Sequence, residues 1–268
     1  MVIAVITCGS LILGLNKGIK QLSVLNIGIA ITLVILVLIA GDTSHLLHAT
    51  ALNVADYTAR FVPLTFETHA DTDPEWFKGW TLLYWAWWIA FAAPTGIFIA
   101  RISRGRTIRE FVVGVLLVPV AFSFLWFAVF GNAALDLIQN QGFSELGEAV
   151  SENSATALFQ FFELFLGWDW IAWLVLACIF IFFITTADSG TLVINLLTSN
   201  KGENVAISGR VFWVAVEFAI TAVLLLAGGM DAIRAVLIIL GFPFAIIVAM
   251  MCLGFIKALL TGNHSTSQ

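Results

Sequence analysis

The segment that decides the fold is residues 84–111, which read YWAWWIAFAAPTGIFIARISRGRTIREF. Four of its first five residues are aromatic, an apolar run follows, and four of the nine positions 101–109 are arginine. An apolar stretch of about 20 residues is long enough to cross a bilayer as a helix, and Lys or Arg at its end marks the cytoplasmic side. We therefore predict a transmembrane helix that begins with an aromatic cluster and ends at a positively charged surface.

The composition of the whole chain agrees with an integral membrane protein. Of the 268 residues, 60% are hydrophobic and only 11% are charged, whereas about 25% of the residues of a soluble domain are charged. The formal net charge of -5 gives no support for nucleic-acid binding. The sequence has no phosphate-binding loop, zinc signature or nucleophile elbow. An intramembrane enzyme is disfavoured because no acid–base pair or nucleophile–base pair appears.

Hydrophobic segments long enough to cross the bilayer occur six times along the chain. A shorter apolar run, residues 1–15, precedes them and lacks the basic start and cleavage site of a signal peptide, so we interpret it as the second half of a span. The six predicted spans are residues 24–41, 81–100, 111–131, 170–195, 211–228 and 235–260.

Basic residues gather in alternate connections between these spans, and the positive-inside rule makes those connections cytoplasmic. The prediction places the connection 101–109 and the C-terminal tail 263–268 in the cytoplasm. Anionic lipid attracts arginines at the inner surface, so they can anchor the preceding helix, with a gating role as the alternative. The arginines of this connection are Arg101, Arg104, Arg106 and Arg109.

The long connection 42–79 is predicted to hold an amphipathic helix that lies along the outer interface, followed by a loop with Pro63 and Pro74. Its simplest role is that of a connector. His45 and His48 could share one helix face and bind a metal, but no carboxylate or thiol completes such a site.

The aromatic cluster is the first candidate binding site. Tyr84, Trp88 and Phe91 share one helix face, and Trp87 neighbours Phe91. Small residues such as Ala90 allow another helix to approach closely. Aromatic faces attract quaternary ammonium groups, so we predict a cation-binding wall, with an interfacial aromatic belt as the alternative.

The second candidate is ITTADSGT, residues 184–191, inside a predicted span. Asp188 is costly in a membrane unless it is paired or hydrated. Thr185 and Thr186 beside it could coordinate sodium, or could form hydrogen bonds between helices. Glu217, in the next span, has no obvious partner, and Asp231 with Arg234 is predicted to form a local ion pair.

Three motifs of the sequence resemble those of a known family. YWAWWIAF followed by IARISRGRTIREF resembles the signature of the betaine/choline/carnitine transporter family. LNKGIKQLSVLN is similar to the connection before that family's seventh span, and FFITTADSGT to its tenth. The resemblance implies an all-α polytopic membrane protein with LeuT-type inverted repeats of five helices, of which this chain holds mainly the second.

The resemblance also implies a division of the chain from the end of span six to span twelve. Residues 1–41 would hold the end of one span and a complete span, and residues 42–79 the outer helix and loop. Residues 80–262 would form the second repeat, and residues 263–268 the tail.

The resemblance assigns roles to individual residues. Trp87, Trp88 and Phe91 match substrate-facing aromatic positions, and Tyr84 shares their face. Phe91 stands where a tryptophan is frequent. Thr185 and Thr186 match hydroxyl positions of a sodium site, with Phe182 beside them. Pro94 stands where sodium-coupled members can carry a phenylalanine, near a second sodium site.

The function that follows is import of a quaternary-ammonium compound such as glycine betaine, choline or carnitine by a secondary active transporter of the plasma membrane. Sodium is the expected coupling ion, with protons or substrate exchange as alternatives, and a homotrimer is the implied assembly. A non-transporting membrane scaffold or subunit is the alternative function. We expect the chain by itself not to transport, because the site lies between two repeats.

Overall fold

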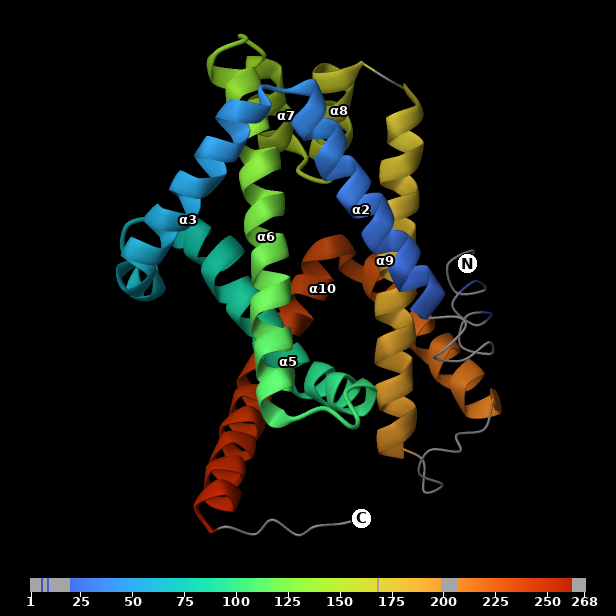
Figure 1. Cartoon of the computed structure of the whole chain (residues 1–268). Helices are drawn as coiled ribbons and strands as arrows, with labels where there is room; N and C mark the ends of the chain where they lie inside the picture. The colour runs from blue at the N-terminus through green and yellow to red at the C-terminus, as the bar shows by residue number, and fades with distance from the viewer. Residues whose placement is uncertain (1–5, 7–8, 10–19, 168, 199–206, 262–268) are drawn as a thin grey trace. The chain divides into compact units, whose positions relative to one another are not determined.

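The computed structural model describes residues 6, 9, 20–167, 169–198 and 207–261, and every regular element in those ranges is a helix (Figure 1). This agrees with the predicted all-α membrane protein. Most of the stub 1–15 and all of the tail 263–268 lie outside the described residues. The elements are α2 (Lys20–Ala40), α3 (Thr43–Phe66), α4 (Pro74–Trp76), the π-helix η2 (Phe77–Leu82), α5 (Leu83–Ile102), α6 (Ile108–Gln139), α7 (Ser144–Glu152), α8 (Ala157–Leu166), α9 (Asp169–Thr198) and α10 (Ile207–Leu260).

Five helical segments in the described part of the chain are long and apolar enough to cross a membrane, where the sequence predicted six. The difference lies in α10, which contains both of the last two predicted spans. Gly228 and Gly229 interrupt it with non-helical dihedral angles, and the φ of 62° at Gly229 is a conformation that favours glycine. Figure 1 shows the chain changing direction between the orange and red arms of α10. The two predicted spans 211–228 and 235–260 therefore correspond to the two arms of α10, which a kink at two glycines separates.

One compact unit consists of Met1–Thr65 and Gly105–Asp188. Its core forms where α2, α6 and α9 meet α7, α8 and the start of α3, as in other helix-on-helix folds. Apolar residues three or four positions apart on α2 and α6 supply much of this core. The buried core residues are Ala30, Leu33, Val34, Val37, Leu46, Val129, Phe130, Ala133, Leu137, Leu146, Phe161, Phe162, Ile171, Val175 and Cys178.

The helix α6 begins at a capping box and is longer than predicted. The Thr107 hydroxyl accepts a hydrogen bond from the Glu110 backbone N–H at 3.2 Å, and the Glu110 carboxylate accepts one from the Thr107 N–H at 2.9 Å. The helix has 32 residues, which is about 48 Å at 1.5 Å per residue, against about 30 Å of bilayer hydrocarbon. Asp136, which was predicted to lie in a connection, is in the last turn of α6. Because α6 is longer than the hydrocarbon is thick, this last turn can project beyond it.

The predicted amphipathic helix exists as α3, but its end was predicted wrongly. Pro63 lies inside α3 rather than in a loop, since the helix continues for three residues beyond it. It does so although proline has no backbone N–H to donate a helical hydrogen bond. Only Leu46 of α3 is buried, and Tyr57 packs edge-on against Phe124 of α6 with ring centroids 5.2 Å apart. The helix is therefore attached mainly by its first turns and this aromatic contact.

The second compact unit consists of Phe66–Arg104 and Ser189–Gln268, and in it α5 and α10 pack closely. A Cβ atom built on Gly241 of α10 would lie 2.7 Å from the Cβ of Ala86 and 2.9 Å from its Cα. Ala86 and Ala90 are the buried residues of α5. The structure thus places the close approach at Ala86, one turn before the predicted Ala90, and it depends on glycine facing alanine.

We expect Gly241→Ala to lower the free energy of unfolding by about 1–3 kcal/mol, because the added methyl group would collide with the Ala86 backbone. Denaturation in mixed detergent micelles measures the change. Gly254→Ala in the same arm is the matched control, since a Cβ atom there meets nothing within 4 Å. The control should be neutral or stabilising by up to about 1 kcal/mol. Equal effects of the two substitutions would contradict the close approach.

Candidate functional site

The predicted aromatic wall lies on the exposed side of α5. Trp88 is 74% exposed, and Tyr84, Trp87 and Phe91 are also exposed. The Tyr84 ring stands 5.8 Å from the Trp87 ring, centroid to centroid, and stacks on Trp80 at 5.7 Å with an interplanar angle of 5°. We define Tyr84, Trp87, Trp88 and Phe91 as the aromatic set; Trp80 extends it by one turn.

Trp80 was missed because it lies before the predicted span. The structure starts this helical segment earlier, at Pro74, where the Asp73 carboxylate accepts a hydrogen bond from the Trp76 backbone N–H at 3.0 Å. A proline at the first position and an aspartate just before it are ordinary start signals. The spacing of four residues between Trp80 and Tyr84 was the available signal. Trp80 belongs to the π-helix η2, a conformation frequent at functional sites.

The predicted hydroxyl set, Thr185 and Thr186 with Phe182, lies on α9. The Thr185 hydroxyl is 3.0 Å from the carbonyl oxygens of both Ile181 and Phe182. In general, a threonine hydroxyl that donates to its own helix can still accept a hydrogen bond or coordinate a cation through its oxygen. Thr186 and Phe182 are exposed. The hydroxyl set belongs to the unit that contains Gly105–Asp188, and the aromatic set to the unit that contains Phe66–Arg104.

Polar side chains follow the hydroxyl set along α9 and are buried. Asp188 is 0% exposed, as expected for a charged residue kept away from lipid. Thr191, one turn later, is also fully buried, and Asn195 is 2% exposed. These positions are three and four residues apart, so they share one face of α9. This face is therefore a polar stripe inside an apolar helix.

The structure provides the partner of Glu217 that the sequence did not reveal. The Thr191 hydroxyl donates a hydrogen bond to Glu217 Oε2 at 2.7 Å, which joins α9 to the first arm of α10. The Asn195 amide donates to the Thr191 carbonyl oxygen at 3.0 Å, and the Thr221 hydroxyl to the Glu217 carbonyl oxygen at 2.8 Å. We define the buried residues Thr191 and Asn195, with the half-buried Glu217, as the buried polar cluster.

The other candidate charged residues lie in or beside the connection 101–109, or beside the kink of α10. Arg104, Arg106 and Arg109 are exposed and Arg101 is half-buried. The predicted pair of Asp231 and Arg234 is confirmed, with nitrogen and oxygen 3.4 Å apart. The anchoring or gating role of the arginines stays a prediction.

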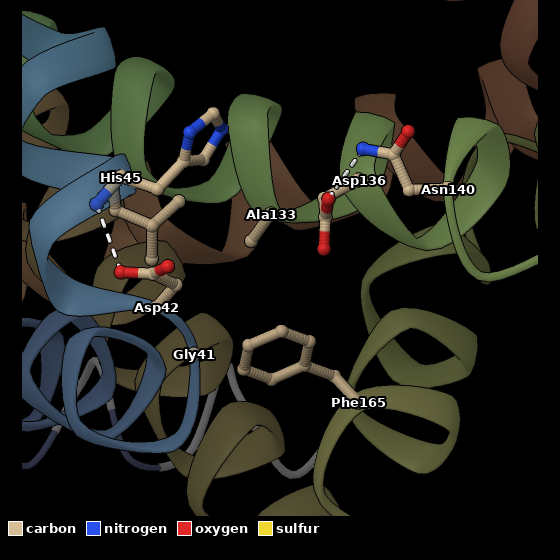
Figure 2. A pocket seen from close by; sticks show the side chains of 8 residues that line it. Gly41, Asp42, His45, Ala133, Asp136, Asn140 and Phe165 are labelled. Atoms are coloured by element: carbon tan, nitrogen blue, oxygen red, sulfur yellow. Dashed lines mark hydrogen bonds between the residues drawn. The ribbon is translucent and has the colours of Figure 1, made fainter.

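A cavity of about 270 Å³ lies in the first unit, where α2 meets α3 and α6 meets α8 (Figure 2). The Asp42 carboxylate accepts a hydrogen bond from the His45 backbone N–H at 3.0 Å, and the Asp136 carboxylate accepts one from the Asn140 amide at 2.7 Å. The polar groups of this cavity thus stabilise helix ends. Among the described residues, no three His, Cys, Asp or Glu side chains gather in a way that could hold a metal ion.

The helical architecture and the apolar helices define a polytopic α-helical membrane protein. The family model for the betaine/carnitine/choline family of transporters matches residues 1–264, and the chain belongs to this family. Its relatives are transporters, a class distinct from enzymes.

Several curated relatives support the assignment. The chain is 41% identical over 220 residues to a glycine betaine transporter of Acinetobacter baylyi, covering 82% of this chain and 33% of the relative. It is 40% identical over 223 residues to the high-affinity choline transport protein of Escherichia coli K12, with the same coverage of 82% and 33%. It is 39% identical over 222 residues to the glycine betaine transporter OpuD of Bacillus subtilis, covering 82% and 42%. The chain thus spans less than half the length of these relatives.

We expect Thr191→Val to lower the free energy of unfolding by about 1–2 kcal/mol, because it leaves Glu217 Oε2 without its donor. Thr198→Val on the same helix is the control, since that hydroxyl donates only to the Ile194 carbonyl oxygen of its own helix. The control should change stability by less than about 0.5 kcal/mol. Denaturation in mixed micelles compares the two variants, and a control effect as large as that of Thr191→Val would argue against the interhelical bond.

Proposed function

We propose that this chain contributes the second repeat of a secondary active transporter that imports a quaternary-ammonium compound such as glycine betaine, choline or carnitine. The observation that carries the proposal is the aromatic set on α5, in a chain whose relatives carry glycine betaine or choline. A trimethylammonium group donates no conventional hydrogen bond, so a protein binds it through aromatic faces.

The arrangement of the rings supports this role. Trp80, Tyr84 and Trp87 form a continuous row in which neighbouring centroids are less than 6 Å apart. Rings fixed by their neighbours lose little conformational freedom when a cation binds. Trp88, with its exposed face on the same helix, is the ring we assign to the closest contact with the ammonium group.

Sodium is the coupling ion that we propose, bound through Thr185 and Thr186 beside Phe182. Sodium is a hard cation that prefers oxygen ligands, and both threonines supply hydroxyl oxygens within one turn of α9. In transporters with inverted repeats the substrate and ion sites lie between the two repeats, and one repeat moves against the other during transport.

We further propose a multi-pass plasma-membrane protein, assembled as a homotrimer, with the arginine connection 101–109 and the C-terminal tail in the cytoplasm.

Because the site requires both repeats, the test uses a chimaera. Residues 20–260 replace the matched segment of the Acinetobacter baylyi glycine betaine transporter, and uptake of labelled glycine betaine is measured in cells that lack other carriers. Trp88→Leu should raise the half-saturating substrate concentration roughly 5- to 30-fold, which corresponds to the 1–2 kcal/mol of a desolvated cation–π contact.

Trp173→Leu is the matched control, because Trp173 is 73% exposed and Trp88 is 74% exposed. The control should leave the half-saturating concentration unchanged. A neutral analogue of the same shape should compete poorly with glycine betaine in the unsubstituted chimaera. Unchanged affinity in Trp88→Leu would rule out the aromatic set as the ammonium site.

The same chimaera tests the ion. Thr186→Ala should raise the sodium concentration for half-maximal uptake several-fold and alter the substrate dependence less, because it removes one of the few oxygen ligands of a hard cation. Thr198→Ala, farther along α9, is the control. If uptake does not depend on sodium in the unsubstituted chimaera or in either variant, the hydroxyls of Thr185 and Thr186 have only a structural role.

A further inference from the structure

Glu217 is half-buried, and only one of its two carboxyl oxygens has a partner in the described part of the chain. Oε2 accepts the Thr191 hydrogen bond at 2.7 Å. Oε1 is also buried, and no donor reaches it from the described part of the chain. Each oxygen of an ionised carboxylate is a strong acceptor, so burying one of them unpaired in an apolar span is costly. Protonation of Oε1 lowers this cost, since the carboxyl group is then neutral.

Within the described part of the chain, the elements around Glu217 carry few charged groups that could compensate an ionised carboxylate. Residues 189–198 of α9, which contain Thr191, include no ionisable side chain. The helix α5, which packs against α10, carries Tyr84 and Arg101 as its titratable groups, and the first arm of α10 carries Arg210 two turns before Glu217. Asp188, one turn before Thr191, adds a further acidic group along α9. The oxygens of the buried polar cluster are too few for sodium, which needs several ligands.

We propose that Glu217 is a proton-binding site. Oε1 takes its proton from water and returns it to water, while Oε2 continues to accept the hydrogen bond from Thr191. In the protonated state the carboxyl group is neutral and holds the first arm of α10 against α9. Loss of the proton strengthens the Thr191 hydrogen bond but leaves a charged carboxylate in an apolar span with Oε1 unpaired, and this desolvation cost favours movement of the first arm of α10 toward water.

The site is placed to act on the rest of α9. Thr191 lies six residues after Thr185, which is about 9 Å along the helix axis. A change in the attachment of α9 to α10 therefore begins less than two turns from the hydroxyl set. The proton site and the proposed sodium site use different residues, so either can be present without the other.

Infrared difference spectroscopy of the 268-residue chain in lipid nanodiscs tests the proposal. Near neutral pH the unsubstituted chain should show the carbonyl band of a protonated carboxyl group, and Glu217→Gln should lose the intensity of one such group. Thr191→Val should shift the frequency of this band, because the carbonyl oxygen loses its hydrogen bond. Thr221→Val is the matched control, since its hydroxyl contacts the Glu217 backbone and not the carboxyl group.

The proposal fails if the band is the same in the unsubstituted chain and in Glu217→Gln, because Glu217 would then be ionised. Circular dichroism checks that the Gln variant is folded. If it is not, Glu217→Asp replaces it: a band at a changed frequency supports the site, and an unmoved band overturns it. The measurement involves neither substrate nor sodium, so its failure would leave the proposed transport function standing.

Discussion

The hydrocarbon interior of a bilayer offers no water to a polar group, and the structure follows from this constraint. Backbone groups are satisfied within helices, as they must be where lipid surrounds a single span. Polar side chains in the spans are then withdrawn from lipid or paired, as Asp188 and the buried polar cluster are. Where no polar pairing is available, helices associate through close packing, for which Gly241 and Ala86 provide the clearest example.

Local patterns predicted local structure well. Apolar runs located the membrane-capable helices, and the spacing of Asp231 and Arg234 predicted their ion pair. Contacts between distant segments escaped prediction, because a hydrogen bond such as Thr191 to Glu217 joins residues 26 positions apart. The short helices α7 and α8 also escaped it, although Phe161 and Phe162 of α8 are in the core of the first unit. A run of ten residues is too short to be recognised as a span, so its burial was invisible in the sequence.

The aromatic set was easier to predict from the sequence than the roles of the hydroxyl set. Periodicity and composition identified the aromatic set, and the structure adds the ring distances and Trp80. The roles of Thr185 and Thr186 came from a family resemblance, because a threonine in an apolar helix most often bonds its own backbone, as Thr185 does. Periodicity alone therefore separates a polar stripe from an apolar one but does not distinguish an ion ligand from a structural hydroxyl.

The interruption of α10 has a mechanical consequence. Its two arms are joined by Gly228 and Gly229 without an intervening loop, so the adjoining ends of the arms cannot move apart. A displacement at the end of one arm is passed directly to the other, whereas a long loop would absorb it. The arm that carries Glu217 is thus tethered to the arm that packs on α5 through Gly241. A lengthened linker would uncouple these two contacts while leaving each arm intact.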